Sequence, residues 1–254
     1  MTMLARTPSL FAFLAVLAGL VVSMPVYVLA GRRRDADQEG KGGQLFGGTG
    51  DFLLHWFMWA IAPLTSVSLR LGLTPGFYNY LGLALGLGAG VFIGLGHLSL
   101  GGWCIALCGV ADILDGRIAR LLGVASGYGD FIDSTFDRYV EVAAFLGFLV
   151  YLRHEPWGPF VAAAAMGGSL VVSYARARGE VLGVLCTGGL MQRGERLVLT
   201  CLACLVDPAL SLGLGWPPGR LVEGVLALIA VATLVTAVHR TIWIARRLGP
   251  QRTR

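Results

Sequence analysis

The sequence predicts an all-α polytopic membrane protein, and three observations carry this prediction. Of the 254 residues, 56% are hydrophobic and only 14% are charged, whereas soluble domains carry roughly a quarter charged residues. The apolar residues form runs long enough to cross a bilayer, which takes about 20 residues in a helix. Glycine is abundant, with 37 residues, and small residues let transmembrane helices pack closely. A soluble globular protein, a disordered protein and a disulfide-stapled secreted domain are thereby excluded.

Seven apolar segments have the length of a membrane-spanning helix. Breaks such as Thr74-Pro75-Gly76 and Pro217-Pro218-Gly219 separate them, because proline and glycine interrupt helices. The segments cover residues 9–30, 77–96, 98–122, 129–152, 157–182, 194–213 and 220–245. In the second segment, glycines recur every fourth residue, at Gly82, Gly86, Gly90 and Gly94, which predicts a stripe for close helix packing.

The first span, within residues 1–30, is predicted to be an uncleaved N-terminal anchor. A signal peptide is the alternative, because Arg6 precedes the apolar run and Val28-Leu29-Ala30 resembles a cleavage site. Cleavage would place the cluster Arg32-Arg33-Arg34 outside the cell, against the positive-inside rule. Residues 31–50 are polar and rich in glycine, which predicts a cytoplasmic linker.

Residues 51–70 differ from the spans because bulky apolar side chains are interspersed there with polar ones. Phe52, Trp56 and Trp59 belong to this stretch, and Arg70 ends it. The pattern predicts an amphipathic helix that lies in the membrane interface.

The basic residues predict the orientation in the membrane. If residues 31–76 lie in the cytoplasm, 17 of the 20 lysines and arginines fall on that side, and only Arg6, Arg153 and Arg220 fall outside. This distribution satisfies the positive-inside rule, so the net charge of +5 reflects topology, and no nucleic-acid partner is expected. We expect a multi-pass protein of the inner (cytoplasmic) membrane, whose basic tail at residues 248–254 faces anionic lipid.

Five aspartates lie between residues 112 and 137, where two predicted spans meet. Asp112 and Asp115 are three residues apart on one helix, and Asp133 and Asp137 are four apart on the next, so each pair shares a helix face. Carboxylates at membrane depth are costly and point to a functional site. The glycine-rich stretch 123–129 between the pairs predicts a turn that makes the two helices antiparallel neighbours.

Both aspartate pairs would then meet at the cytoplasmic ends of facing helices. One interpretation is that Arg117, Arg120 and Arg138 merely neutralise carboxylates at helix ends. However, four converging carboxylates repel one another unless cations lie between them, and oxygen ligands without histidine or thiolate favour Mg²⁺ or Mn²⁺. Two such ions, about 3.5–4 Å apart, are a common device for displacement at phosphorus. The sequence therefore predicts a two-ion site of this kind.

Residues 112–137 resemble the signature of the CDP-alcohol phosphatidyltransferase family, D-x2-D-G-x2-A-R-x8-G-x3-D-x3-D. Every fixed position of the signature is matched, by Asp112, Asp115, Gly116, Ala119, Arg120, Gly129, Asp133 and Asp137. The resemblance implies a catalytic domain at residues 51–247, built from an interfacial helix and six transmembrane helices, with the N-terminal span as an addition. It leaves open a homodimer, which is common in the family. Asp130 and Glu141 fall outside the signature and are expected to support the site or to be solvated.

The resemblance also implies a role for each aspartate. Asp112, Asp115 and Asp133 would bind two Mg²⁺ or Mn²⁺ ions with help from Asp137, which would act as general base on the acceptor hydroxyl. The substrates would be CDP-diacylglycerol, or a similar CDP-alcohol, and a small polar alcohol. CMP would leave as the hydroxyl attacks the other phosphorus.

The CDP-alcohol is expected to lie against the small residues and the arginine of the signature. Gly116 would let the CDP moiety approach the backbone, Arg120 would contact its phosphates, and the Ser126 hydroxyl suits the same diphosphate. The other residues expected at this site are Ala119, Gly129, Pro75 and Gly76. The family often has Thr-Pro-Asn where this chain has Thr74-Pro75-Gly76, and Asn79 comes three residues late, which puts a contact from an asparagine side chain in doubt.

Arginines near the ends of two later spans predict the kind of acceptor. The four are Arg176, Arg178, Arg193 and Arg196. Guanidinium groups grip phosphate bidentately, so we expect a phosphorylated acceptor, with Glu180 and Glu195 orienting the arginines. The alternative is that these are ordinary positive-inside charges.

The stretch 173–196 is similar to the S-Y-x-K/R-A-R-x-E and E-R motifs of phosphatidylinositol phosphate synthases, with Gly179 in place of the more usual alanine. This similarity implies inositol 1-phosphate as the acceptor. Glycerol 3-phosphate is the alternative, because it also carries a phosphate, whereas serine offers none for the arginines.

Two other classes of membrane protein share part of the pattern. Intramembrane prenyltransferases also hold diphosphates on Mg²⁺ through aspartate motifs, but several helices usually separate those motifs, whereas Asp115 and Asp133 are 18 residues apart. A cation-binding membrane transporter would need the carboxylates but not Gly116, Arg120 and Gly129. We therefore expect a metal-dependent transferase of phospholipid biosynthesis.

Overall fold

The computed structural model describes residues 8–29, 31, 49–186 and 188–249 of the chain. Nearly all of these residues are helical, and no strand occurs among them. In chain order the helices are α1 Pro8–Leu29, α2 Thr49–Ala60, α3 Ala62–Arg70, α4 Pro75–Gly94, α5 Leu98–Leu121, α6 Gly127–Tyr151, α7 Gly158–Val181, α8 Arg193–Leu214 and α9 Arg220–Leu248. Most of the predicted linker at 31–50, and the predicted tail beyond residue 249, lie outside the described residues.

Each of the seven predicted spans corresponds to one long helix. In the described part of the chain, α1, α4, α5, α7, α8 and α9 are long and apolar enough to cross a membrane. α6 is as long, with 25 residues, but it carries the charged side chains Asp130, Asp133, Asp137, Arg138 and Glu141. The protein is an integral membrane protein in which one long helix brings several charges to the bundle.

The interfacial helix predicted at 51–70 is divided into two helices. α2 and α3 meet at Ile61, and Pro63 lies in the first turn of α3. Proline lacks the N–H donor, and its ring clashes with the preceding turn, so a helix rarely continues through it. The prediction of one continuous helix is therefore wrong, although its extent is close to that observed.

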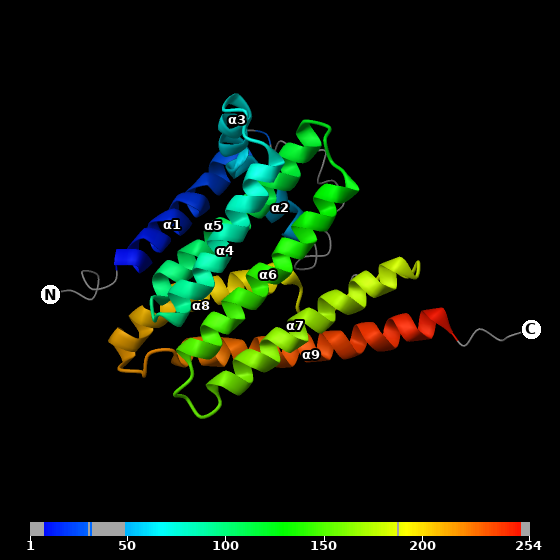
Figure 1. The fold of residues 1–254 in the computed structure, drawn as a ribbon. Helices are drawn as coiled ribbons and strands as arrows, with labels where there is room; N and C mark the ends of the chain where they lie inside the picture. The colour runs from blue at the N-terminus through cyan, green and yellow to red at the C-terminus, as the bar shows by residue number, and fades with distance from the viewer. Residues whose placement is uncertain (1–7, 30, 32–48, 187, 250–254) are drawn as a thin grey trace, which may run out of the picture.

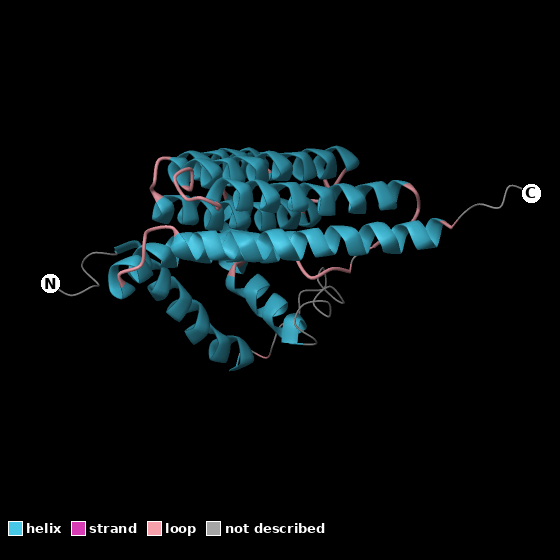
Figure 2. Ribbon diagram, turned by 90° about the horizontal axis from the view of Figure 1, so that it is seen from below, coloured by secondary structure: helices cyan, strands magenta, loops and turns pink. Residues whose placement is uncertain are grey.

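The helices from α4 onward form a bundle (Figures 1 and 2). α4 packs against α5 and α6, α5 against α8, α6 against α7, and α7 lies alongside α9. In Figure 2 the long helices lie stacked in layers. Because successive long helices run in opposite directions, the starts of α4, α6 and α8 and the ends of α5, α7 and α9 gather at one end of the bundle. The aspartate signature lies at that end.

The glycine stripe of α4 forms the contact between α4 and α6. A Cβ atom at Gly90 would lie 2.3 Å from the carbonyl oxygen of Ala143, and one at Gly86 would lie 2.3 Å from Val140 Cγ2. On the α6 side, a Cβ atom at Gly147 would lie 2.3 Å from the Gly90 carbonyl oxygen. The predicted stripe therefore packs within one chain and brings the two backbones into contact.

α1 contacts α2 as well as α5 and α8 of the bundle. Tyr27 is buried, and its ring centroid lies 5.7 Å from those of Phe52 and Trp59. The indole N–H of Trp56 donates a hydrogen bond of 2.9 Å to Ser23 Oγ. Most of the described α1 side chains are otherwise exposed, as expected of a span that faces lipid.

Candidate metal and substrate site

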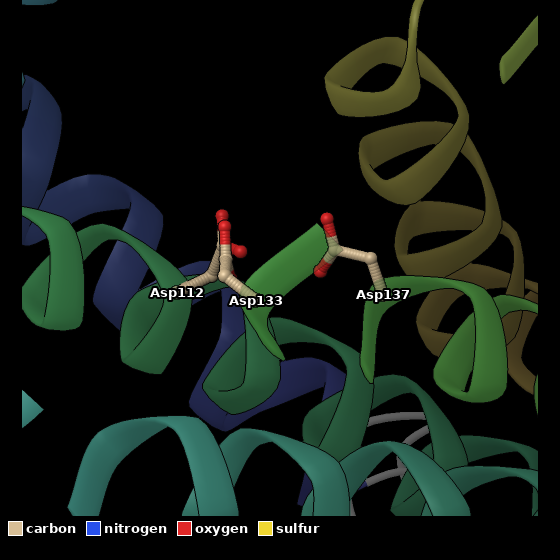
Figure 3. A group of neighbouring side chains, drawn as sticks. All are labelled: Asp112, Asp133 and Asp137. Atoms are coloured by element: carbon tan, nitrogen blue, oxygen red, sulfur yellow. The ribbon is translucent and has the colours of Figure 1, made fainter. Parts of the chain in front are cut away.

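Three carboxylates of the signature form a cluster between α5 and α6 (Figure 3). Asp112 comes from α5, and Asp133 and Asp137 come from successive turns of α6. One carboxylate oxygen of each lies within 4.8 Å of the others, and all three residues are half-buried. These oxygens suit a divalent cation such as Mg²⁺ or Mn²⁺, which would relieve the repulsion between the carboxylates.

Asp115, the remaining signature aspartate, lies outside this trio. It is buried, with 5% of its surface exposed. Together with the other three aspartates it lines a small cavity of about 10 Å³, which Tyr78 and Asn79 of α4 also line. The structure thus brings all four carboxylates to one cavity, with three of them close enough to share an ion.

Arg193, the first residue of α8, contacts this cluster. Its Nη1 donates a hydrogen bond of 3.1 Å to Asp112 Oδ1, and its Nη2 forms an ion pair with Asp137. The sequence predicts Arg193 at the acceptor phosphate, and in the structure it lines a large cavity described below. The structure adds a contact with the aspartates, which the spacing along the chain could not reveal.

A second cavity, of about 120 Å³, adjoins the aspartates on the side of α4. It is lined by most of the residues predicted to bind the CDP-alcohol, namely Pro75, Gly116, Ala119, Arg120, Ser126 and Gly129. Gly76 does not line it. Asp115 and Asp133 do, so this cavity shares a wall with the aspartate cluster. We refer to it as the CDP-side cavity.

Two residues of the CDP-side cavity have a clear local role. Ser126 caps α6, because its Oγ accepts a hydrogen bond of 3.2 Å from the Gly129 N–H. The N-terminus of α6, whose dipole favours anions, therefore begins at the cavity wall. A Cβ atom at Gly116 would lie only 3.3 Å from Arg120 Nη1, so a larger residue there would displace the guanidinium.

Asn79 lines both the CDP-side cavity and the small aspartate cavity. It lies one helical turn after Pro75, and residues four apart share a helix face. Its displacement along the chain from the position usual in the family puts it in doubt from the sequence alone. The four-residue spacing between Pro75 and Asn79 is the signal in the sequence that could have assigned Asn79 to the site.

A third cavity, of about 780 Å³, lies between α6, α7, α8 and α9 and reaches Asp133 and Asp137. We refer to it as the acceptor cavity, because three of the four arginines predicted to bind the acceptor line it. Its walls carry five arginines, Arg138, Arg176, Arg193, Arg196 and Arg240. A cavity with so many guanidinium groups suits an anionic ligand, above all a phosphate.

Some of the predicted arginines and glutamates line the acceptor cavity in the structure, and others do not. Arg176 lines the acceptor cavity, with its Nε donating a hydrogen bond of 2.8 Å to Glu180 Oε1. Arg178 is exposed on α7 and does not line the cavity. Glu195 accepts a hydrogen bond of 2.7 Å from the Gln192 backbone N–H and caps α8, so it does not orient an arginine as expected.

Arg240 is a cavity residue that is absent from the arginines predicted at the acceptor. It is 3% exposed, and it donates hydrogen bonds to the carbonyl oxygens of Gly188, at 2.9 Å, and Val172, at 3.1 Å. An arginine inside the apolar segment 220–245 was a signal, because a charge at membrane depth is costly unless it has a function or a partner.

Comparison with known proteins accounts for this arrangement. Residues 69–237 match the model of the CDP-alcohol phosphatidyltransferase family. The chain belongs to this family. The match begins within α3, so α1 and α2 lie outside the family model. The expected fold class and enzyme class are confirmed: the protein is a membrane-bound transferase of phospholipid biosynthesis.

Curated relatives are about one-third identical to the chain over the aligned residues. The phosphatidylinositol phosphate synthase of Mycobacteroides abscessus is 34% identical over 183 residues, which cover 70% of this chain and 80% of that protein. The phosphatidylinositol phosphate synthase of Streptomyces avermitilis is 33% identical over 198 residues, covering 75% of this chain and 80% of that protein.

Solved structures of the phosphatidylinositol phosphate synthase of Mycobacterium tuberculosis resemble the fold. The crystal structure with CDP-DAG bound has a TM-score of 0.62 and 29% identity, and the match covers 72% of this chain and 92% of that one. The complex with manganese and citrate has a TM-score of 0.63 and 28% identity, covering 72% of this chain and 87% of that one.

Proposed function

We propose that this enzyme transfers the phosphatidyl group of CDP-diacylglycerol to a hydroxyl of inositol 1-phosphate and releases CMP. The observation that carries the proposal is the position of Asp133, which lines the aspartate cavity, the CDP-side cavity and the acceptor cavity. The reacting groups of two substrates bound on either side would therefore meet at the aspartates. The relatives named phosphatidylinositol phosphate synthase, and the related structure with CDP-DAG bound, support this choice of substrates.

The metal ligands in this proposal are Asp112, Asp133 and Asp137, with Asp115 beside them. Their oxygens fit Mg²⁺ or Mn²⁺, and a related structure holds manganese. When bound, one or two ions would neutralise the diphosphate and stabilise the charge that develops on the departing CMP.

Asp137 is placed to act as the general base. It lines both the aspartate cavity and the acceptor cavity, so its carboxylate borders the space where an acceptor hydroxyl would lie. The proton of that hydroxyl passes to Asp137. The oxygen forms a bond to the phosphorus that carries the diacylglycerol, and the bond from that phosphorus to the CMP oxygen breaks.

The arginines of the acceptor cavity would bind the phosphate of the acceptor. Arg176, Arg193 and Arg196 are the predicted members, and Arg138 and Arg240 join them. Glycerol 3-phosphate carries the same phosphate group and is the alternative acceptor. A cation-binding transporter would have no use for an arginine-lined cavity beside the aspartates.

We further propose that residues 51–247 form the catalytic domain, that residues 1–30 anchor the chain, and that the site faces the cytoplasm across an inner membrane. The distribution of arginines supports this orientation, because the arginine-lined cavity lies at the predicted cytoplasmic end of the bundle. A homodimer stays a prediction. The α4 glycine stripe does not support it, because those glycines pack against α6 of the same chain.

The test is CMP release by the purified protein from CDP-diacylglycerol with Mg²⁺, offering inositol 1-phosphate, glycerol 3-phosphate, inositol or serine separately. We expect release with inositol 1-phosphate, loss of release with EDTA, and recovery with added Mg²⁺ or Mn²⁺. Release with glycerol 3-phosphate alone would keep the reaction and replace the acceptor. No release with any alcohol would contradict the proposed function.

A further inference from the structure

Glu141 is a largely buried carboxylate that lies outside the aspartate signature. It follows Asp137 by one turn on α6, and its side chain is 10% exposed. Its Oε1 accepts a hydrogen bond of 2.8 Å from Arg196 Nε, and Arg196 Nη2 lies 2.7 Å from the same oxygen. Its Oε2 accepts a hydrogen bond of 2.5 Å from Arg138 Nη1. One carboxylate therefore joins two guanidinium groups.

The two arginines line the acceptor cavity, but Glu141 does not. Arg138 and Arg196 belong to the wall of that cavity. Glu141 lines a second, mostly apolar cavity of about 50 Å³ between α5, α6 and α8, which shares Asp137, Arg193 and Arg196 with the acceptor cavity. A ligand in the acceptor cavity would therefore meet the guanidinium groups, with the glutamate behind them.

The Glu141 network connects three helices around the acceptor cavity. Arg196 belongs to α8 and Arg138 to α6, and Arg138 Nη1 also donates a hydrogen bond of 2.5 Å to Ser173 Oγ on α7. Arg196 is only 3% exposed, and neither its Nη1 nor its Nη2 makes a hydrogen bond in the described part of the chain, although Nη2 lies 2.7 Å from Glu141 Oε1. Both nitrogens belong to the arginine that lines the acceptor cavity in front of Glu141.

We propose that Glu141 is a positioning residue for the phosphate of the acceptor, an inference that rests on the proposed function. Its carboxylate accepts a hydrogen bond from Nε of Arg196 and forms an ion pair with Nη2, which fixes the plane of the guanidinium and leaves the Nη1 donor for a ligand. It also offsets the repulsion between the guanidinium groups of Arg138 and Arg196. A glutamine has no charge and replaces one of the two acceptor oxygens by a donating NH₂ group, so it cannot keep both arginines in this arrangement.

The experiment compares Glu141→Gln with the unchanged protein, measuring CMP release as each substrate is varied. We expect KM for the phosphorylated acceptor to rise about tenfold or more, because charge-assisted hydrogen bonds are lost. KM for CDP-diacylglycerol should stay unchanged, because neither arginine lines the CDP-side cavity. Inhibition by inorganic phosphate should weaken in the same proportion as acceptor binding.

Two further variants separate positioning from a purely structural role. Glu141→Asp keeps the charge and should recover part of the acceptor affinity, and it carries the test if Glu141→Gln fails to fold. Glu223→Gln is the matched control, because Glu223 pairs with Arg220 at 3.1 Å in the first turn of α9, at the opposite end of the bundle. This control should leave both KM values unchanged.

The outcomes distinguish this inference from the proposed function. Suppose that the unchanged protein is active. A Glu141→Gln variant whose acceptor KM is unaltered, or whose two KM values rise equally, would then overturn the role of Glu141 but not the proposed function. An unchanged protein that releases no CMP with any phosphorylated acceptor would overturn the proposed function itself.

Discussion

At the residue scale, the chemistry depends on opposite charges brought together from distant parts of the chain. Arg193 lies 81 residues after Asp112, yet their side chains form an ion pair of 3.1 Å, and the same guanidinium contacts Asp137. The guanidinium group of Arg193 therefore lies beside the carboxylates that would also attract a divalent ion. Because Arg193 lines the acceptor cavity as well, one guanidinium lies between the aspartates and the proposed phosphate site.

Replacing Asp137 by asparagine tests the general base directly. We expect kcat for CMP release to fall by about 10²–10⁴-fold, because the amide cannot take the proton of the acceptor hydroxyl. Thermal unfolding in detergent should show that the variant is folded. Glu155→Gln, outside the site in the turn that joins α6 to α7, serves as the control. Turnover at the unchanged rate in Asp137→Asn would remove Asp137 from the role of base.

At the scale of single elements, backbone contact between helices holds the aspartate pairs in register. α4 packs against both α5 and α6, and its glycines allow the α6 backbone to approach without an intervening side chain. A second device lies at the opposite end of the bundle. There the buried Asp207 of α8 accepts hydrogen bonds from the backbone N–H groups of Gly219, Leu221 and Val222, and so caps α9.

A methyl group at Gly90 should loosen the contact between α4 and α6. Its Cβ atom would lie 2.3 Å from the Ala143 carbonyl oxygen, so the backbones must separate, at a cost of about 1–3 kcal/mol in the free energy of unfolding. Gly88→Ala, on the same helix, is the matched control, because its Cβ atom would lie 3.9 Å from Phe92. Thermal unfolding in detergent should rank Gly90→Ala well below Gly88→Ala, and equal midpoints would contradict this packing.

At the scale of the whole molecule, an extra helix is joined to a family domain. The family model begins at residue 69, whereas the described chain begins with α1. That helix contacts α2, α5 and α8, and its buried ring, Tyr27, packs against α2. No residue of α1 lines the aspartate cavity, the CDP-side cavity or the acceptor cavity. We therefore expect α1 to contribute to anchoring and stability, and not to the chemistry.

Deleting residues 1–31 tests this separation of roles. We expect KM for both substrates to stay unchanged, while the free energy of unfolding falls by about 2 kcal/mol, because the burial of Tyr27 is lost. Thermal unfolding and CMP release should be measured on the same preparation, with full-length Tyr27→Ala as a control that reproduces much of the loss. Abolished turnover without a change in thermal midpoint would instead give α1 a part in the reaction.

The sequence by itself determined the membrane class, the seven long helices, the aspartate signature and the family. These features depend on local composition, on the length of apolar runs and on fixed spacing within two adjacent helices, all of which are readable along the chain. The division of the 51–70 helix at Ile61 was also local, and Pro63 was its signal.

Only the tertiary structure decided which side chains meet across helices. It brought Arg193 to the aspartates, placed Arg138 and Arg240 in the acceptor cavity, left Arg178 outside it, and showed that Asp207 caps a helix. The physical reason is that helix rotation and crossing set these distances, and they depend on packing between residues far apart in the chain. A charged residue inside an apolar segment indicates that its side chain has a partner, but the neighbouring residues in the sequence do not identify that partner.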